Sequence, residues 1–408
     1  MNQLLVVCCL QGSGKSHFAR EFKKESSWMN CVILSSDEIR KEFPNYDNEK
    51  VFKKLYDRMN KAFKDSNRDE EILVIIDATN TTIKSRRKLL DSIENKEDIY
   101  KRCMIINTPY EVCLERVRER NKKPDSHYVP EDVLEKYYRS FEIPFKEEGW
   151  NEVELAYYTF PKHSEKYLSD LWSRARYFNQ HNKHHTQLLG QHLESVYNYL
   201  NKNINMCKDS LLMAGKYHDI GKLFTQKYKD GDTNAHYYDH ANVGAYNLLC
   251  FACMTGNWAG FDVNKTLDWL FYINYHMKMH DIKTDKLRSK WELIFGSKKF
   301  NDLENLYKAD CYRPEEPKNE DDDTPKANKK YDNIIEQMKC DIRTYTSDLD
   351  LYEHTLKTRL WRCEPIRASQ PLYYAPSTNG TDDIQPIDLL PVTEIRRGGL
   401  ITDEDLPF

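Results

Sequence analysis

The sequence predicts an α/β domain with a parallel sheet, followed by an all-α domain. In the first 160 residues, short apolar runs alternate with polar segments of helical composition. This alternation is typical of a parallel sheet that is covered by helices on both faces. From about Ser164 onward, long segments with apolar residues at helical spacing replace the strand-like runs. At 408 residues the chain is also too long for one ordinary core.

Five segments have the composition of buried strands: Leu4–Leu10, Cys31–Ser36, Ile72–Asp77, Arg102–Asn107 and Glu152–Tyr158. The second half contains helical segments such as HLESVYNYLNKN, SLLMAGKYHDIGKLF and TLDWLFYINYHMKMH. A charged stretch with prolines then predicts a loop, followed by one more helical segment. We therefore place a first domain at residues 1–162, a second at 163–362 with a loop at 314–330, and an irregular tail at 363–408.

Composition and charge restrict the class of protein. Apolar residues make up 39% of the chain and charged residues 31%, which is typical of soluble globular proteins. The net charge of −4 provides no global positive field, so a nucleic-acid site must be a local basic patch, and a protein that passively coats DNA is disfavoured. The N-terminus has no secretory pattern, and no apolar run reaches the length of a membrane helix. We expect a cytoplasmic protein with no membrane partner, in which Cys250 and Cys253 serve core packing rather than metal binding.

A glycine-rich loop, CLQGSGKS, follows the first predicted strand and precedes a helical segment. In that context, Gly12, Ser13 and Gly14 would let backbone N–H groups surround the phosphates of a nucleotide. Lys15 would neutralise the transferred phosphoryl group, and Ser16 would hold Mg²⁺. The loop therefore predicts ATP and Mg²⁺ as cofactors, although Cys9 replaces the first glycine of the full pattern.

Carboxylates and an arginine near the ends of later strands indicate an acceptor site. Asp37 follows the second predicted strand, where it could accept a proton from an acceptor hydroxyl or merely cap the helix that begins there. Arg40 is one helical turn later and could hold an acceptor phosphate. Asp77 ends the third strand in the position of a metal-supporting carboxylate, at the edge where open α/β sheets bind ligands.

Five cations lie within eight residues in the segment ERVRERNKK. They are Arg116, Arg118, Arg120, Lys122 and Lys123. Such a run fits a lid that closes over phosphates, or a solvated helix face.

The second half contains a series of histidines and aspartates around an adjacent pair, His218 and Asp219. The other members of the series are His192, His240, His276 and Asp310. Imidazole and carboxylate ligands without thiolates favour Mn²⁺, Fe²⁺, Co²⁺, Ni²⁺ or Zn²⁺ over Ca²⁺, and the sequence does not choose among them.

We expect one metal site made of His192, His218, Asp219 and Asp310. His240 and His276 would complete a second site, bridged by Asp219. Lys222 could offset phosphate charge or simply end a helix. The remaining candidates for phosphate contact are His184, His185, His236 and His280.

The first half resembles the kinase domain of phage polynucleotide kinase-phosphatase and its bacterial relatives. The resemblance covers residues 1–160 and is carried by GSGKS, SSDEIR, IIDATNTTIKSRR, RERNKKPDSHYVPEDVL and FEIPFKEEGWNEVEL, in that order. It implies that Lys15 and Ser16 bind ATP and Mg²⁺, that Asp37 is the general base toward a 5′-OH, and that Arg40 contacts the acceptor's phosphate. It further implies that Asp77 supports the metal and that Arg120 is a lid arginine. Pro124 stands where the family has a second lid arginine.

The second half resembles the HD-superfamily phosphohydrolase domains of RNA-end-processing and tRNA-maturation enzymes. The resemblance covers residues 165–315 and is carried by NQHNKHHTQLLGQHLESV and HDIGK together with the later His and Asp residues. The combination of the two halves is similar to bacterial HD-polynucleotide kinases, with the domain order reversed.

Three functions are compatible with these observations. In the first, the chain heals RNA (or DNA) ends, such as those of a cleaved tRNA: it phosphorylates the 5′-OH with ATP and removes a 2′,3′-cyclic, 2′- or 3′-phosphate, so that a separate RNA ligase can join the ends. In the second, a nucleoside or nucleotide kinase is joined to a nucleotidase that acts on small molecules. In the third, both halves are noncatalytic scaffolds of a nucleotide-gated sensor or of a partner-binding protein. The sets of catalytic residue types argue against the third function.

Overall fold

The computed structural model describes residues 1–26, 30–66, 71–123, 128–157, 164–181, 187–204, 208–229, 234–252, 263–312 and 373–375. Of these, the residues up to Asp310 belong to one compact unit. The predicted loop at 314–330, the helical segment after it and most of the tail lie outside the described residues, as do His184, His185 and Cys253. Among the described helices, none combines the length and apolar character needed to cross a bilayer.

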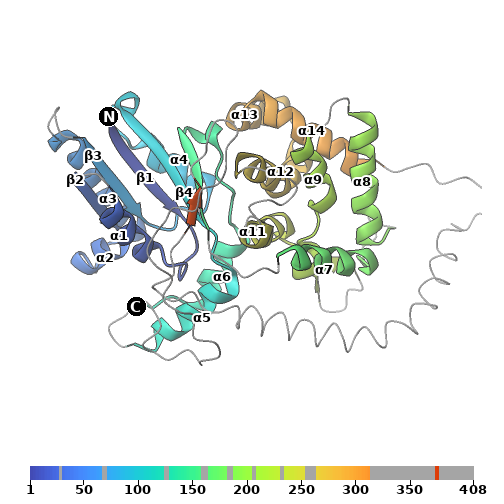
Figure 1. Cartoon of the computed structure of the whole chain (residues 1–408), viewed down its shortest axis with the longest axis horizontal. Helices are drawn as coiled ribbons and strands as arrows, with labels where there is room; N and C mark the ends of the chain where they lie inside the picture. The colour runs from blue at the N-terminus through green and yellow to red at the C-terminus, as the bar shows by residue number, and fades with distance from the viewer. Residues whose placement is uncertain are drawn as a thin grey trace, which may run out of the picture. The chain divides into compact units, whose positions relative to one another are not determined.

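The N-terminal half is built on a sheet with the strand order β2-β3-β1-β4-β5-β8 (Figure 1). The strands are β1 (Asn2–Cys8), β2 (Asn30–Ser35), β3 (Ile72–Asp77), β4 (Ile99–Ile106), β5 (Glu152–Tyr157) and β8 (Tyr373–Ala375). The first five are parallel, as the sequence predicts, and their bounds differ from the predicted ones by three residues or fewer. β8 adds an antiparallel edge strand beside β5, so the prediction of an irregular tail is wrong at these three residues.

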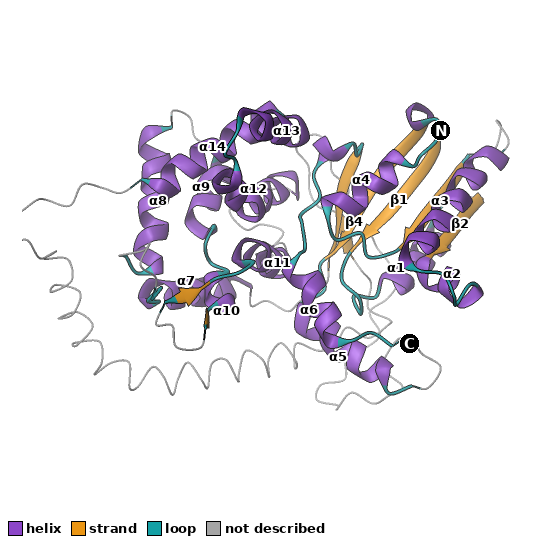
Figure 2. Ribbon diagram, turned by 180° about the vertical axis from the view of Figure 1, so that it is seen from behind, coloured by secondary structure: helices purple, strands orange, loops and turns teal. Residues whose placement is uncertain are grey.

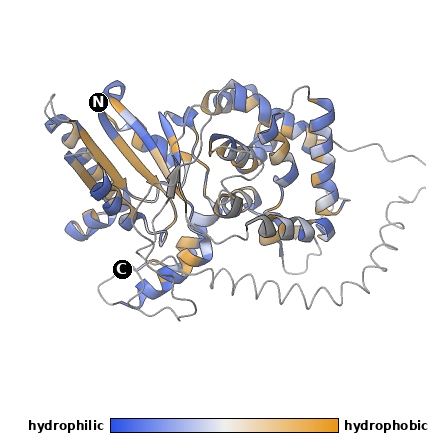
Figure 3. Ribbon diagram, viewed as in Figure 1, coloured by the Kyte–Doolittle hydropathy of each residue, from blue (hydrophilic) through white to orange (hydrophobic). Residues whose placement is uncertain are grey.

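The apolar strand sequences are explained by burial from both sides. Every residue of β3 is buried, and the strands are among the most hydrophobic parts of this region in Figure 3. Phe18 and Ala19 of α1 pack against one face of the sheet. α4 covers the other face (Figure 2). Its Arg86 approaches the thiol of Cys8. The helices of this half are α1 (Lys15–Glu25), α2 (Ser36–Glu42), α3 (Asn48–Asp65), α4 (Ile83–Asp91), α5 (Tyr110–Asn121) and α6 (Glu131–Arg139).

The second half is helical, as predicted. Its helices are α7 (Ser164–Tyr177), α8 (Leu189–Asn203), α9 (Asp209–Tyr217), α10 (Lys222–Thr225), α11 (His240–Ala252), α12 (Val263–Asp281), α13 (Asp285–Phe295) and α14 (Ser297–Cys311). A short antiparallel hairpin of β6 (Lys227–Tyr228) and β7 (Ala235–His236) is an exception that the sequence analysis missed. Two-residue strands are too short to produce a periodic signal.

The segment after α6 joins the two halves through buried contacts. Ile143 N donates to Asn274 Oδ1 at 3.0 Å, and the Tyr275 hydroxyl donates to Ile143 O at 3.1 Å. The carbonyl of Phe141 accepts from Asn274 Nδ2. The ring of Phe145 contacts Phe271, Tyr275 and Phe295. The kinase-like half and the helical half therefore share a packed core, although the predicted boundary at residue 162 stays a prediction.

Replacing Phe145 with alanine is expected to destabilise both halves together. Removing a buried phenylalanine ring costs about 3–5 kcal/mol, and this ring lies in the shared core. Calorimetry should show one unfolding transition that moves to lower temperature as a whole. Leu293→Ala, at a side chain that is 84% exposed, serves as the control and should leave the transition in place. Two transitions, of which only one moves, would contradict a shared core.

Candidate active sites

The loop between β1 and α1 has the backbone geometry of a phosphate cradle. Gly12 and Gly14 have φ angles of 78° and 94°, in the left-handed region that glycine adopts without strain. Two side chains stabilise the loop through its carbonyl groups: Thr108 Oγ1 donates to Ser13 O at 2.8 Å, and Arg116 Nη1 donates to Gly12 O at 3.3 Å. The N–H groups at the start of α1 therefore border a preformed anion site.

Gly12→Ala is expected to reduce the kinase activity at least about tenfold, because a left-handed alanine is strained by about 1–2 kcal/mol and the loop must also move. A Cβ atom at this position would lie 2.5 Å from the backbone oxygen of Cys113. The variant should bind ATP more weakly in calorimetric titration. Far-UV circular dichroism should be unchanged, because the substitution affects one loop, and a loss of helical signal would indicate misfolding instead.

Lys15, Ser16 and Asp77 form the centre of this site. Lys15 Nζ lies 3.4 Å from Asp77 Oδ1 and 3.5 Å from Asp37 Oδ2. Although burial opposes it, the attraction of Asp77 and Asp37 raises the pKa of Lys15, so the ammonium group stays charged. Ser16 Oγ donates to Asp77 Oδ2 at 2.7 Å. This hydroxyl and this carboxylate fit the oxygen donors that Mg²⁺ prefers, and the charge of Lys15 fits a nucleotide phosphate.

Asp37 is directed into the site rather than into the helix end. The N-cap of α2 is Ser35, whose side chain accepts from Asp37 N, so the alternative that Asp37 only caps the helix is wrong. Its two carboxylate oxygens face different cations: Oδ2 faces Lys15, and Oδ1 accepts from Arg40 Nη1 at 3.1 Å. Arg40 also donates to Asn48 Oδ1. The carboxylate is 34% exposed, so an acceptor hydroxyl can approach it.

The five cations of α5 and the residues after it do not act as one group. Arg116 is buried beneath the glycine-rich loop. It therefore belongs neither to a lid nor to a solvated helix face, the two roles predicted for the run. Arg118 pairs with Glu131, and Lys122 pairs with Glu119, near the surface. Arg120 is partly buried and lies within electrostatic reach of Asp37; burial lowers the pKa of its guanidinium, and the attraction of Asp37 opposes this. Arg120 thus interacts electrostatically with Asp37.

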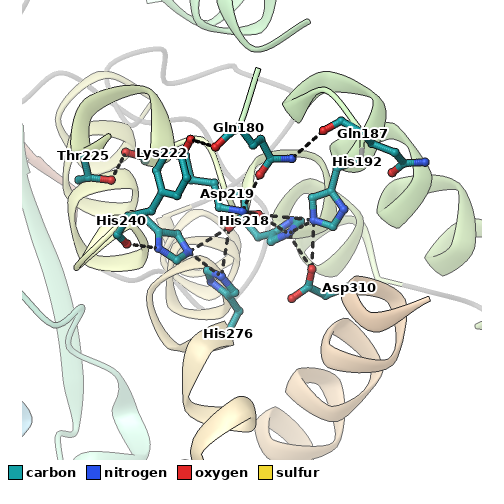
Figure 4. A network of polar contacts seen from close by, with 12 residues as sticks. Gln180, Gln187, His192, His218, Asp219, Lys222, Thr225, His240, His276 and Asp310 are labelled. Atoms are coloured by element: carbon teal, nitrogen blue, oxygen red, sulfur yellow. Dashed lines mark hydrogen bonds and ion pairs between the residues drawn. The ribbon is translucent and has the colours of Figure 1, made fainter. Parts of the chain in front are cut away.

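The helical half contains a second centre, in which side chains from four helices and one turn converge (Figure 4). The structure brings together every predicted ligand: His192 of α8, His218 and Asp219 at the end of α9, His240 of α11, His276 of α12 and Asp310 of α14. Helix α9 ends at Tyr217, within the segment SLLMAGKYHDIGKLF that was predicted to be helical, so the His-Asp pair lies at the turn that follows. This turn lets both side chains point to the same space.

The ligand atoms form two overlapping sets. His192 Nε2, His218 Nε2, an oxygen of Asp219 and an oxygen of Asp310 lie within 4.8 Å of one another, and the same limit holds for Asp219, His240 and His276. Asp219 Oδ2 faces the first set, at 3.4 Å from His192, and Asp219 Oδ1 faces the second, at 3.0 Å from His240. Asp219 thus directs one carboxylate oxygen toward each ligand set.

Backbone carbonyls fix three of the four imidazoles. The Nδ1 atoms of His218, His240 and His276 lie 3.1, 2.8 and 2.7 Å from the oxygens of Gly215, Tyr237 and Ile273. A proton on Nδ1, donated to the carbonyl, leaves a lone pair on Nε2 that can bind a metal. Metal-binding histidines usually have such a hydrogen bond from the second ring nitrogen. The donor set therefore fits a transition metal.

The charge of this centre also fits a cation. Burial alone would raise the pKa of Asp219, but Lys222 and His218 hold this pKa well below its usual range. Burial lowers the pKa of His276 to about 4, so its imidazole is neutral and available as a ligand. Against burial, Asp219 and Asp310 raise the pKa of His192 to about 9. A metal bound there would take the place of this proton.

Lys222 belongs to the centre. The residue is 4% exposed. Its ammonium group lies 2.6 Å from Asp219 Oδ2 and donates to Gln180 Oε1 at 2.8 Å. It is the first residue of α10, so the alternative of a lysine that ends a helix is wrong. Gly221 permits this packing, because a Cβ there would lie 1.9 Å from His240 O.

The looser candidates have different positions. His280 Nε2 lies 3.0 Å from Asp310 Oδ2, outside the two ligand sets, and His236 lies on β7. Two residues of these sites were not predicted from the sequence: Gln180, which accepts from Lys222, and Thr108, which donates to the glycine-rich loop. Both lie outside helices and strands, and no spacing pattern points to them.

Comparison with known proteins gives a match to a family model described as AAA domain over residues 4–144, which is less than half of the chain. A chain of the Pnkp1/Rnl/Hen1 RNA repair complex is similar at 25% identity over 33% of this chain and 42% of its own length, with a TM-score of 0.29. Kti12 of Chaetomium thermophilum in complex with ADP-AlF3 is similar at 18% identity over 42% and 97%, with a TM-score of 0.31. A fungal RNA kinase is similar at 14% identity over 43% and 87%, with a TM-score of 0.28. The N-terminal half is a kinase-type P-loop domain.

Proposed function

We propose that this protein heals broken RNA ends, with the P-loop half phosphorylating a 5′-OH and the helical half removing the phosphate at a 3′ end. The observation that carries the proposal is the presence of two different reactive centres in one compact unit. One is organised around Lys15 and Asp37, and the other around His218 and Asp219. A strand break with a 5′-OH and a phosphorylated 3′ end needs both chemistries.

In the kinase reaction, the oxygen of a 5′-OH attacks the γ-phosphorus of ATP, and the bond to the β-phosphate oxygen breaks. Asp37 accepts the hydroxyl proton, while Lys15 and the N–H groups after Gly12 stabilise the charge on the phosphate oxygens. Arg40 is placed to contact a phosphate of the acceptor strand, and Arg120 to contact the donor. Ser16 and Asp77 would hold Mg²⁺, which supplies further charge neutralisation.

In the phosphoesterase reaction, the oxygen of a water molecule attacks phosphorus and an ester bond to the ribose breaks. A 2′,3′-cyclic phosphate would open to a monophosphate, and a second hydrolysis would release inorganic phosphate. The six His and Asp ligands would hold one or two ions of Mn²⁺, Fe²⁺, Co²⁺, Ni²⁺ or Zn²⁺, which supply Lewis-acid activation of water and of the phosphoryl group. Lys222 stabilises the negative charge of the Asp219 carboxylate.

The products of the two reactions are a 5′-phosphate and a 3′-OH, which are substrates for a separate ligase. A cleaved tRNA is a suitable substrate. DNA ends can carry the same 5′-OH and 3′-phosphate, but without a 2′-OH they form no 2′,3′-cyclic phosphate. We place the kinase domain at residues 1–162 and the phosphoesterase domain at 163–362.

The test is mass analysis of a tRNA-like oligonucleotide with a 5′-OH and a 2′,3′-cyclic phosphate after incubation with ATP, Mg²⁺ and Mn²⁺. The expected products have gained a phosphate at the 5′ end and lost the one at the 3′ end. In competition, the oligonucleotide should be phosphorylated in preference to a nucleoside, and its binding should weaken with salt as counterions are released. Equal or better phosphorylation of the nucleoside would favour a small-molecule kinase and nucleotidase instead.

A further inference from the structure

The hairpin β6–β7 carries an exposed aromatic and basic face beside the His/Asp centre. We propose that this face, the stacking platform of Lys227, His236 and Tyr238, binds the last bases of a single-stranded nucleic acid whose 3′-phosphate enters the centre. The proposal rests on the proposed function of the helical half, and it names the kind of substrate that this half selects.

Hairpin register places the three side chains together. Lys227 pairs directly with His236 across the hairpin, and residues opposite one another share a face of a sheet. The rings of His236 and Tyr238 lie with their planes 3° from parallel and their centroids 5.6 Å apart. Tyr238 is 55% exposed, and Lys227 is exposed as well. A nucleic-acid base can stack on such a surface, because every base has an apolar face.

The stacking platform is attached to the metal ligands by short connections. Tyr238 precedes the ligand His240 by two residues, which is at most about 7 Å of backbone. Between them, Asp239 has a φ of 62°, a left-handed conformation that is strained for a residue other than glycine. The intervening Tyr237 accepts from His240 Nδ1 through its carbonyl and donates to the carbonyl of Gln180 through its hydroxyl. Gln180 in turn holds Lys222, so the hairpin and the centre are one connected structure.

The surroundings of the stacking platform are polar rather than apolar, and they carry charges of both signs. A pocket of about 470 Å³ lies beside it, between the hairpin and α6. It is lined by Lys136, Arg139, Lys227, Ser140, Asp132, Glu135 and Asp239. Arg139 pairs with Glu135, lies 4.0 Å from Asp239 and approaches the carbonyl of Tyr238 at 3.5 Å. Lys136 and Lys227 are exposed cations at the same pocket, placed to approach phosphates between stacked bases.

The test compares Tyr238→Ala with Tyr238→Phe, which keeps the ring. The probes are a ten-residue oligouridylate with a 5′-fluorescein and a 3′-phosphate, and bis(p-nitrophenyl) phosphate, a small ester that cannot span the platform and the centre. Loss of one stacked base costs about 1–3 kcal/mol, so Tyr238→Ala should raise KM for the oligonucleotide about tenfold more than for the small ester. Tyr238→Phe should restore KM. The control is Tyr46→Ala on the P-loop half, at an exposed tyrosine, which should leave both values unchanged.

An unchanged KM for the oligonucleotide in Tyr238→Ala, or an equal rise for both probes, would overturn the proposal. If the wild-type protein hydrolyses neither probe, the proposed phosphoesterase function fails, and fluorescence anisotropy with the same oligonucleotide then tests the platform separately. A Kd that rises in Tyr238→Ala and recovers in Tyr238→Phe supports the platform, and a Kd equal to that of the wild type rejects it.

Discussion

Asp219→Asn is expected to lower the proposed phosphoesterase activity by a factor of at least about 10³, while the kinase activity persists. Asp219 is the carboxylate that faces both ligand sets, and it also neutralises the buried Lys222. An amide of the same shape cannot supply the negative charge, so metal affinity and substrate activation should fall together. The measurements are metal content after dialysis and hydrolysis of the 3′-phosphate oligonucleotide, each beside a kinase assay.

A matched control for this variant lies on the same helix as Asp310. Asp302 is also buried, accepts from the Tyr272 hydroxyl at 2.6 Å and pairs with Lys208, but it belongs to neither ligand set. Asp302→Asn should reduce stability and retain metal. Excess metal at 100 times its Kd should stabilise the wild type by about 2.7 kcal/mol. Asp219→Asn should lose this stabilisation, whereas Asp302→Asn should keep it. Equal metal binding by Asp219→Asn and the wild type would contradict the bridging role.

The site residues that could be predicted from the sequence are those whose position depends on neighbouring residues in the chain. The glycine-rich loop follows a strand directly, so the positions of Lys15 and Ser16 follow from a few neighbouring residues. Asp37 and Asp77 could be placed beside them because the carboxyl ends of parallel strands meet at one edge of a sheet. In the helical half, the order of the His and Asp residues indicated a common centre. This is so although His192 and Asp310 are 118 positions apart in the sequence.

Residues that depend on tertiary contacts could not be placed in this way. Arg116 belongs to a basic run that reads as a surface feature, and only its packing against Gly12 shows that it supports the loop. Gln180 lies between segments with no periodic pattern, and its role depends on Lys222, 42 residues away. The contacts of Phe145 with α12 and α13 likewise join parts that look independent in the sequence.

Asp37→Asn is expected to lower the kinase kcat by about 10²–10⁴, and Lys15→Met by about 10²–10³. The first change keeps the shape of the side chain and removes the proton acceptor, and the second removes the charge opposite the phosphates. Neither residue belongs to the His/Asp centre, so phosphoesterase activity should persist in both variants. The measurement is transfer of radiolabelled phosphate from ATP to a 5′-OH oligonucleotide.

Asp47→Asn separates a catalytic role of Asp37 from a structural one. Asp47 is an aspartate of the same region whose side chain does cap a helix, since it accepts from Lys50 N at the start of α3. Asparagine caps helices about as well as aspartate, so this variant should keep full kinase activity. If Asp37→Asn behaves like Asp47→Asn, then Asp37 only supports the fold and the acceptor hydroxyl loses its proton elsewhere. The other outcome is that Asp37→Asn loses kinase activity while its melting temperature equals that of Asp47→Asn. The contacts of the Asp37 carboxylate with Lys15 and Arg40 then serve the chemistry of phosphate transfer.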